Sequence, residues 1–147
     1  MTGILEESFI RDAYIYDVYD GDTVYYHANL GYGTWAAFQT GRLLNIDTPE
    51  IRPLVTREAA TEAKDHLKRL LRQYALNIGD TESLRAGYKF RLQSIPCSNK
   101  WVRSIPQPQK GKYGRWLVTI WGATSTGDAV NLNKLMIADG FAQPASY

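Results

Sequence analysis

Carboxylates and arginines gather in three short segments of this chain, at residues 20–23 (DGDT), 42–50 (RLLNIDTPE) and 112–115 (KYGR). Carboxylate oxygens suit hard cations such as calcium and magnesium, and a guanidinium grips phosphate oxygens through two parallel hydrogen bonds. A further carboxylate can orient or deprotonate a water molecule. Hydrolysis of a phosphodiester needs all of these parts, because the transition state carries growing negative charge and the water must attack in line with the leaving oxygen.

Each segment also has a simpler interpretation. Asp-Gly is a frequent turn signal, because the Asp side chain bonds to the local backbone. Thr-Pro-Glu after a strand can open a helix, and Tyr-Gly-Arg can be a turn before an exposed arginine. The combination therefore carries the hypothesis of a phosphodiester-cleaving site, which rests on Asp22, Asp47, Glu50, Arg42 and Arg115.

Other kinds of chemistry find little support in the composition. Cys97 is the one cysteine, so a disulfide within the chain and a cysteine-based zinc cluster are both excluded. His27 and His66 stand in no recognisable motif. A formal net charge of +2 is too small to attract nucleic acid by itself, so any phosphate binding must come from local placement of arginine and lysine.

Length and composition favour a single globular domain over residues 1–147, with its core at residues 9–142. The chain is 44% hydrophobic and 22% charged, which is ordinary for such a domain. No run approaches the roughly 20 apolar residues that span a bilayer, so we expect no membrane partner. Glu6 and Glu7 stand where a secretory signal would need basic and then apolar residues. We therefore expect a cytoplasmic protein, although a chain secreted after processing would look the same.

The elements that must position the charged segments are mainly strands. β-Branched and aromatic residues predict strands at 9–18, 23–30, 34–46, 87–95 and 115–123. A turn is expected at Tyr19–Asp22 and a hairpin tip at Gly31–Gly33, and the long third strand needs a bend or bulge. Residues 94–110 form an expanded, proline-containing segment, which is either a long exposed loop or an extended hairpin arm.

Two segments have helical spacing. After Pro53, Thr56 is placed as an N-cap and Glu58 in the first turn of a helix, whose apolar residues recur at helical intervals up to Tyr74. The opposite side of this helix is predicted to be a solvated face, and it carries Lys64, Lys68, Arg69 and Arg72. Asn131 and Gly140 bound a short second helix, with Leu132, Leu135 and Met136 on one face.

Five strands with one helix inserted after the third predict an α+β fold that is mainly β. We expect a five-stranded barrel of the oligonucleotide/oligosaccharide-binding (OB) type with two or three helices, since closure of the sheet removes exposed edges and leaves a binding face.

The ordered set of motifs resembles the staphylococcal nuclease-like (thermonuclease) family. The match runs through DGDTV, RLLNIDTPE, the amphipathic helix, KYGR and VNLNKLMIADGFA, and it covers most of residues 14–142. The resemblance implies an OB barrel with added helices and calcium-dependent cleavage of DNA and RNA. We expect a monomer. The rival hypothesis is a module of the same fold that binds nucleic acid or peptide without cutting, because fold alone does not establish activity.

The resemblance also implies a cation site and its neighbours. Asp22 and Asp47 would bind calcium through their carboxylates and Thr48 through its backbone carbonyl, with Asp20 as an acid close to the metal. Glu50 matches the carboxylate that is assigned as general base toward the attacking water. Magnesium or manganese would suit the same oxygen ligands.

The phosphate-binding residues follow from the same match. Arg42 and Arg115 correspond to the two arginines that hold the scissile phosphate, while Lys112 and Tyr113 correspond to residues that contact the terminal phosphate of a bound nucleotide. Gly111 stands where the family often has an acid. The connection between Thr23 and Arg42 is longer than in the prototype, so its hairpin should project further from the barrel.

One physical objection applies to residues 42–47. In a regular strand, side chains five positions apart point to opposite faces, so Arg42 and Asp47 could not share a site. Asn45 tolerates a positive φ better than most residues. We therefore predict that the strand pairing is interrupted near Asn45.

Overall fold

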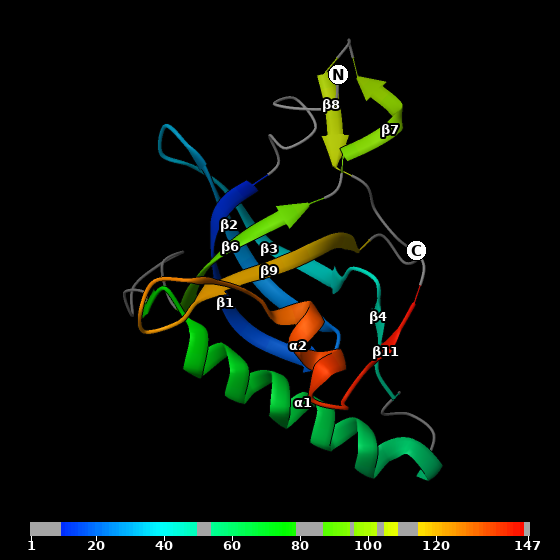
Figure 1. Ribbon diagram of the computed structural model, residues 1–147. Coiled ribbons are helices and arrows are strands. Elements are labelled where there is room, and N and C mark those ends of the chain that lie inside the picture. Colours follow the sequence, from blue (N-terminus) through cyan, green and yellow to red (C-terminus); the bar gives the residue numbers. More distant parts are fainter. Residues whose placement is uncertain are drawn as a thin grey trace.

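The computed structural model describes residues 10–49, 54–78, 87–94, 96–102, 105–108 and 115–145 (Figure 1). Its centre is a closed barrel of five strands in the order β9-β3-β2-β1-β6, in which the pairing of β6 with β9 closes the sheet. The strands are β1 (Ile10–Asp20), β2 (Thr23–Gly31), β3 (Thr34–Leu43), β6 (Tyr88–Ser94) and β9 (Trp116–Ala123). The expected OB-like α+β class is therefore confirmed.

Pairing within the barrel is antiparallel except between β3 and β9, which run parallel. Hydrophobic alternation decides which side chains face the core. Val24 and Tyr26 of β2 and Ile15 of β1 are buried, whereas the residues beside them, Tyr25, Tyr14 and Tyr16, are more exposed. Phe90 of β6 and Ile120 of β9 complete the same core.

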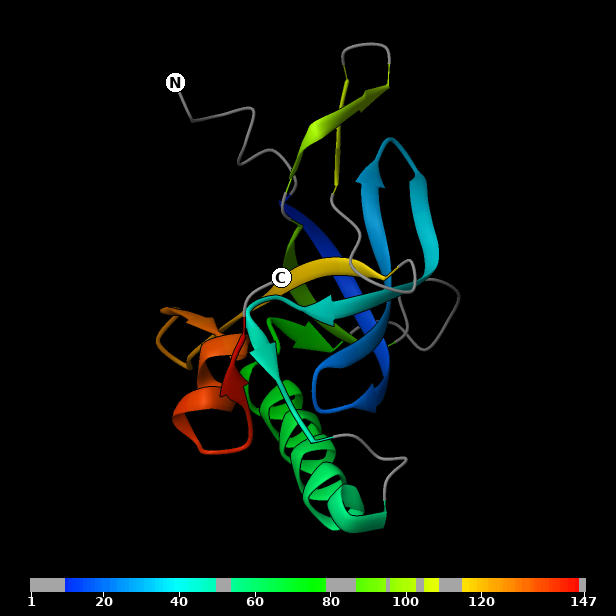
Figure 2. The same ribbon diagram turned by 90° about the vertical axis from the view of Figure 1, so that its right-hand side faces the viewer.

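The bend expected in the third strand is a β-bulge. Tyr26 faces Gln39 and Ala28 faces Ala36, so His27 of β2 stands opposite two residues of β3, Ala37 and Phe38. The expected hairpin tip is also present, since Gly31, Tyr32 and Gly33 all have positive φ. The β2–β3 hairpin projects from the barrel on the side away from the helices (Figures 1 and 2).

Helix α1 (Leu54–Tyr74) runs beneath the barrel and buries Ala63, Leu67, Leu70 and Leu71 in its core (Figure 1). The helix begins at Leu54, so the expected N-cap at Thr56 is wrong and Glu58 lies beyond the first turn. Proline lacks only an N–H that the first helical turn leaves unpaired, so the sequence permits a helix that starts directly after Pro53.

Helix α2 (Leu132–Ala138) has the limits that the sequence predicted. The side chain of Asn131 accepts a hydrogen bond from the N–H of Lys134, and Gly140 adopts a φ of 85° directly after the C-cap residue. Leu132 and Met136 are fully buried against the barrel. Among the described residues, no helix is long and apolar enough to cross a membrane.

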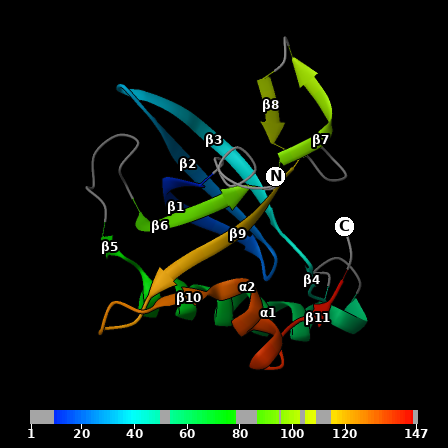
Figure 3. The same ribbon diagram turned by 45° about the horizontal axis from the view of Figure 1, so that its top comes forward.

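The remaining strands are short additions to the barrel. β7 (Pro96–Val102) and β8 (Ile105–Pro108) pair antiparallel, so this part of the segment 94–110 is a hairpin arm and not a loop (Figure 3). β4 (Ile46–Asp47) pairs with β11 (Gln143–Pro144) in a separate small sheet. β5 (Asn77–Ile78) and β10 (Ala129–Asn131) extend the two edges of the main sheet.

Candidate functional site

Arg42 lies at the centre of a buried cluster of charges near the end of β3. Its Nη1 is 2.9 Å from Oδ2 of Asp22, and its Nη2 donates to Oδ1 of Asp47 at 3.1 Å. The side chains of Arg42 and Asp22 are 6% and 7% exposed, whereas that of Asp47 is 60% exposed. One guanidinium thus joins a buried and an open carboxylate that the sequence had assigned to the same site.

Asn45 makes this meeting possible. Its φ is 64°, and the main sheet ends at Leu43, so the alternation of side chains stops before Asp47. Asp47 then pairs with Gln143 in the small β4–β11 sheet, and the carbonyl of Asn45 accepts the N–H of Ala145 at 2.9 Å. The predicted interruption near Asn45 is confirmed.

Gly21 places the turn that carries Asp22. A Cβ on Gly21 would lie 2.8 Å from Cβ of Ala63 and 3.0 Å from Cγ2 of Thr48, so the turn packs directly on α1 with no room for a side chain. The carbonyl of Asp22 accepts the N–H of Leu43 at 2.7 Å. Backbone contacts on both sides therefore fix the Asp22 side chain in the cluster.

Asp22 is surrounded by hydrogen-bond donors. Besides the guanidinium of Arg42, it accepts the hydroxyl of Thr23 at 3.1 Å and the N–H of Thr48 at 3.2 Å. The hydroxyl oxygen of Thr48 is itself buried and has no hydrogen-bond partner among the described residues. A buried polar atom without a hydrogen bond destabilises the folded state, and a further ligand at this place would remove that cost.

Arg115 reaches the same cluster from the start of β9. It directly precedes β9, and β9 lies parallel to β3 with Leu117 opposite Arg42. Nη1 of Arg115 donates to the hydroxyl of Thr23 at 3.3 Å, and Thr23 is in turn the cross-strand partner of Arg42. The structure therefore brings both sequence-predicted arginines to one side of the barrel.

Asp20 adds a second acid beside Asp22. Burial, and next the hydrogen bond and negative charge of Asp22, raise the pKa of Asp20 to about 7. One Oδ1 of Asp20 also accepts the N–H of Asp22 at 3.2 Å. Two carboxyls so close compete for ionisation, and a positive charge placed near them would relieve their repulsion.

Asn133 of α2 supports the cluster from behind, and the sequence interpretation missed it. Its Nδ2 donates to the carbonyls of Leu44 and Val118 at 3.1 and 3.0 Å, and its Oδ1 accepts the N–H of Ile120. This buried amide ties the end of β3 to β9, and so holds Arg42 in line with Arg115. The sequence signal was a polar residue three positions before Met136, on a face that is otherwise apolar.

Glu50, Lys112 and Tyr113 lie outside the described residues, so their predicted roles stay predictions. Among the described residues, no group of three or more His, Cys, Asp or Glu side chains is close enough to hold a metal ion. Of the predicted acids that the structure describes, Asp22 and Asp47 both contact Arg42, and Asp20 accepts the N–H of Asp22.

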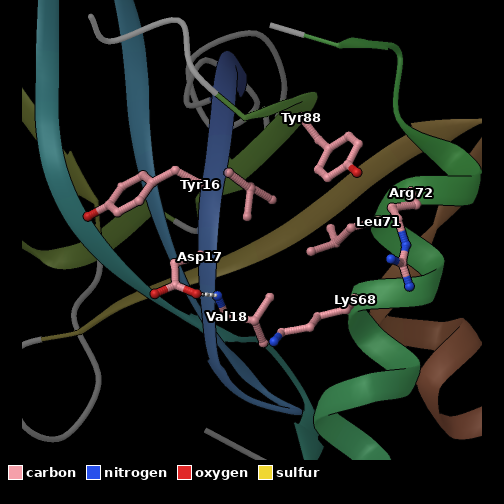
Figure 4. A pocket seen from close by; sticks show the side chains of 8 residues that line it. Tyr16, Asp17, Val18, Lys68, Leu71, Arg72 and Tyr88 are labelled. Atoms are coloured by element: carbon pink, nitrogen blue, oxygen red, sulfur yellow. Dashed lines mark hydrogen bonds between the residues drawn. The ribbon is translucent and has the colours of Figure 1, made fainter. Parts of the chain in front are cut away.

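A separate pocket of about 180 Å³ lies between β1 and α1 (Figure 4). Its walls are mainly apolar, with Lys68 and Arg72 of α1 along one side, and it shares no lining residue with the charged cluster. These two side chains were expected on a solvated helix face, and both residues are indeed exposed. The carboxylate of Asp17 at this pocket accepts the N–H of Val18 at 2.8 Å.

Comparison with known proteins adds no assignment. No family model matches the chain, and no curated protein matches it significantly.

Proposed function

We propose that this protein is a calcium-dependent nuclease of the staphylococcal nuclease-like type, which hydrolyses phosphodiester bonds in DNA, RNA or both. The observation that carries the proposal is the meeting of Asp22, Asp47 and Arg42, with Arg115 one hydroxyl away. These residues come from three separate segments, and each belongs to a motif of the family that the sequence resembles.

Arg42 and Arg115 supply the phosphate-binding groups in this proposal. Guanidinium donors match the spacing of phosphate oxygens, and in a buried site they stabilise the charge that grows in the transition state. Arg42 is held by carboxylates at two of its nitrogens, so its position is set before substrate arrives. Such preorganisation reduces the reorganisation that the reaction itself would otherwise require.

Asp22, Asp47 and the backbone carbonyl of Thr48 would hold the cation. All three offer oxygen ligands, which hard cations prefer. The Thr48 hydroxyl, which has no partner among the described residues, and the raised pKa of Asp20 both fit added positive charge here. A bound calcium ion would polarise a phosphate oxygen as a Lewis acid. If a cation neutralised these carboxylates, the N–H groups of Arg42 that they now accept would become available to phosphate.

Glu50 completes the proposed reaction as the group that takes a proton from the attacking water. This role rests on the motif alone, in which Glu50 follows Asp47 by three positions and Thr48 by two. A carboxylate is a suitable acceptor when it lies within hydrogen-bond reach of the water.

The alternative is a module that binds nucleic acid or peptide without cutting it. The observation in its favour is that Asp22 and Asp47 already neutralise Arg42, so the cluster also forms a structural tie between β3, the turn before β2 and β4. A purely structural cluster would need neither a cation nor substrate.

Cleavage of plasmid and single-stranded DNA by the purified protein decides between the two. We expect cleavage with calcium and none with chelator, and magnesium and manganese should be tried in parallel. Absence of cleavage with every cation would overturn the nuclease proposal and leave the binding module.

Asp47→Asn links such activity to this cluster. The open Asp47 can lose its charge without unfolding the protein, and we expect the calcium needed for half-maximal cleavage to rise roughly tenfold or more. Asp128→Asn is the matched control, because Asp128 is an exposed acid in the turn after β9. An equal effect of both changes would place the cation elsewhere.

A further inference from the structure

Aromatic side chains cover the outer surface of β1, β2 and β3, outside the charged cluster. Three of them are well exposed: Phe38 at 72%, Tyr19 at 47% and Tyr16 at 38%. We define the aromatic face as the six rings Tyr14, Tyr16, Tyr19, Tyr25, Trp35 and Phe38. A group of large rings held in solvent marks a binding surface more often than a single exposed hydrophobic residue does.

The rings make contact in two groups. Tyr14 lies 5.8 Å from Trp35, and Tyr16 contacts both Tyr25 and Phe38. Tyr16 stacks on the imidazole of His27 with centroids 4.5 Å apart, and Phe38 meets the same imidazole edge-on at 4.7 Å. Tyr25 lies 6.2 Å from Tyr16 and 6.3 Å from Tyr19. His27 is only 4% exposed and thus forms the floor between the more exposed rings.

The barrel core dictates which way these rings point. Ala13 and Ile15 of β1 are buried, so Tyr14 and Tyr16 alternate to the outside. Figure 4 shows the ring of Tyr16 on the opposite side of β1 from Leu71 and Tyr88.

Phe38 is held outward by a strained backbone. Its φ is 55°, a left-handed value that a bulky residue rarely adopts, and it occupies the β2–β3 bulge. Nδ1 of His27 accepts the N–H of Phe38 at 2.9 Å, which fixes this conformation. An apolar ring that is both strained and exposed stabilises neither the backbone nor the core, and such positions cluster where ligands bind.

The aromatic face is continuous with the candidate site. Thr23, Tyr25 and His27 alternate along the outer side of β2, and Thr23 contacts both Asp22 and Arg115. Thr40, which pairs with Tyr25, stands on β3 between the bulge and Arg42. A chain bound at the two arginines can therefore continue along β2 and β3 toward the hairpin.

Spacing favours a single strand over a duplex. Side chains on one face of a strand repeat every two residues, about 6.8 Å, whereas bases in a duplex rise only about 3.4 Å per nucleotide. Rings at the wider spacing can each receive a base only where the bases are unstacked, as in a single strand.

Charge at the border of the face is mixed. Lys89 of β6 is the cross-strand partner of Tyr14, and Arg91 lies two residues further along β6. Asp12 is 3.9 Å from the nitrogens of both, and Asp17 adds a second carboxylate near the rings. Lys89 and Arg91 can meet a few phosphates, while the two acids disfavour a densely charged duplex, so stacking must supply most of the affinity.

We propose that the aromatic face binds the bases of a single-stranded nucleic acid that enters or leaves the candidate site. The proposal rests on the proposed function, which it deepens by naming single strands as the preferred substrate. Its contacts, however, involve rings that no cleavage step requires.

The test is binding of a fluorescent oligothymidylate of about 12 nucleotides, measured by anisotropy in chelator so that nothing is cut. Loss of one stacking ring should weaken binding roughly tenfold in Phe38→Gly and in Tyr16→Ala, while Phe38→Trp should bind like the wild type. Glycine adopts the positive φ at residue 38 without strain, so Phe38→Gly should still fold, and circular dichroism checks this.

Tyr32→Gly is the matched control. Tyr32 also has a φ of 55° and is fully exposed, but it stands at the hairpin tip, away from the stacked rings. We expect its replacement to leave affinity unchanged. Equal weakening by Tyr32→Gly and Phe38→Gly would assign the effect to the hairpin backbone and overturn the proposal.

Two further outcomes would also overturn it. One is an unchanged affinity for the oligonucleotide in Phe38→Gly. This outcome includes the case in which ultracentrifugation shows that the aromatic face joins two copies of this chain. The other is equal or tighter binding of the same oligonucleotide when it is annealed to its complement. Because chelator removes cleavage from the measurement, failure of the nuclease proposal would leave these binding results unchanged.

Discussion

The charged cluster around Arg42 and the aromatic face around Phe38 both place side chains in an unusual environment. The cluster buries charged groups, whereas the face exposes large apolar rings. Arg42 and Asp22 form a salt bridge that is kept almost fully from solvent, whereas Phe38 is an apolar ring that is 72% exposed. Burial of charge costs free energy unless it is paired, and exposure of an apolar ring forgoes the gain from burial.

The two regions are also held in place by different means. The cluster is fixed by direct bonds between side chains, so it depends on partners that lie far apart in sequence. The aromatic face is fixed by the backbone, through the bulge at Phe38 and its bond to His27. We infer that the cluster performs the chemistry, which needs charges at set positions, while the face supplies affinity, which needs only accessible rings.

Replacement of Arg115 by lysine should have the largest effect and should separate the two regions. Lysine cannot form the planar fork, so we expect turnover to fall by roughly 10³-fold. The oligonucleotide affinity measured in chelator should stay within about twofold, because lysine keeps the positive charge and the rings supply most of the affinity. Arg72→Lys on α1 is the control and should leave cleavage intact.

Near-normal turnover in Arg115→Lys would remove Arg115 from the mechanism. A matching loss of affinity and turnover would merge the cluster and the face into a single binding surface.

Glu50→Gln tests the proposed proton acceptor. The amide is nearly isosteric but cannot accept a proton from water, so we expect turnover to fall by roughly 10²-fold or more. Calcium affinity, measured by calorimetry, should change little. Equal losses in turnover and calcium affinity would instead make Glu50 a metal ligand.

Arg42→Met tests how strongly the cluster depends on paired charge. The change leaves the buried Asp22 without its guanidinium, and loss of one partner of such a pair costs about 3 kcal/mol or more in free energy of unfolding. Urea denaturation measures this loss, and Arg91→Met at an exposed position of β6 is the control. The double change Arg42→Met with Asp22→Asn should recover part of the stability, and simple additivity of the two losses would contradict the pairing.

Substitutions at Asn45 test the backbone strain in the charged cluster separately from the strain at Phe38. Because Asn45 has a φ of 64°, Asn45→Ala should cost about 1 kcal/mol, whereas Asn45→Gly should be tolerated or slightly stabilising. Cleavage should follow the same order, since the turn brings Asp47 to Arg42. Equal stability of the two variants would show that the left-handed conformation at this residue is not required.

The smallest expected effect is a dependence of the aromatic face on pH. Burial lowers the pKa of His27 below its ordinary value of 6.5, so the folded protein favours the neutral ring whose Nδ1 accepts the N–H of Phe38. This contribution to stability is complete above the unfolded pKa and is lost as the pH falls through the lowered folded pKa. Tyr16, the ring stacked on His27, stays uncharged in this range because its own pKa is raised, mainly by burial.

Urea midpoints measured from about pH 7 down to about pH 5 should therefore fall more steeply for the wild type than for His27→Gln. Parallel curves for the two proteins would exclude His27 as the titrating group.

Much of the fold was predictable because its signals are local. Runs of β-branched and aromatic residues predicted the five barrel strands, and Asn131 with Gly140 predicted the limits of α2. The start of α1 was missed by three residues, since the Thr56 cap signal competed with the equally local signal of Pro53. The 96–108 arm had both loop and hairpin interpretations, because its prolines weaken the strand signal.

The candidate site was predictable only in part. The motifs named Asp22, Arg42 and Asp47, and the conflict with strand alternation even located the interruption at Asn45. Asn133 was missed because its partners lie far from it in sequence, at Leu44 just after β3 and at two residues of β9. No local sequence pattern reveals hydrogen bonds to such distant residues.

By itself the sequence determined the positions of the five barrel strands along the chain, the residue types available for phosphate and cation chemistry, and the need for a break before Asp47. Only the tertiary structure decided that Arg42 bridges Asp22 and Asp47, that Arg115 approaches through Thr23, and that the aromatic rings form one face. The physical reason is range: propensity and alternation act between neighbours in the chain, whereas ion pairs and ring contacts depend on how the closed barrel brings distant strands together.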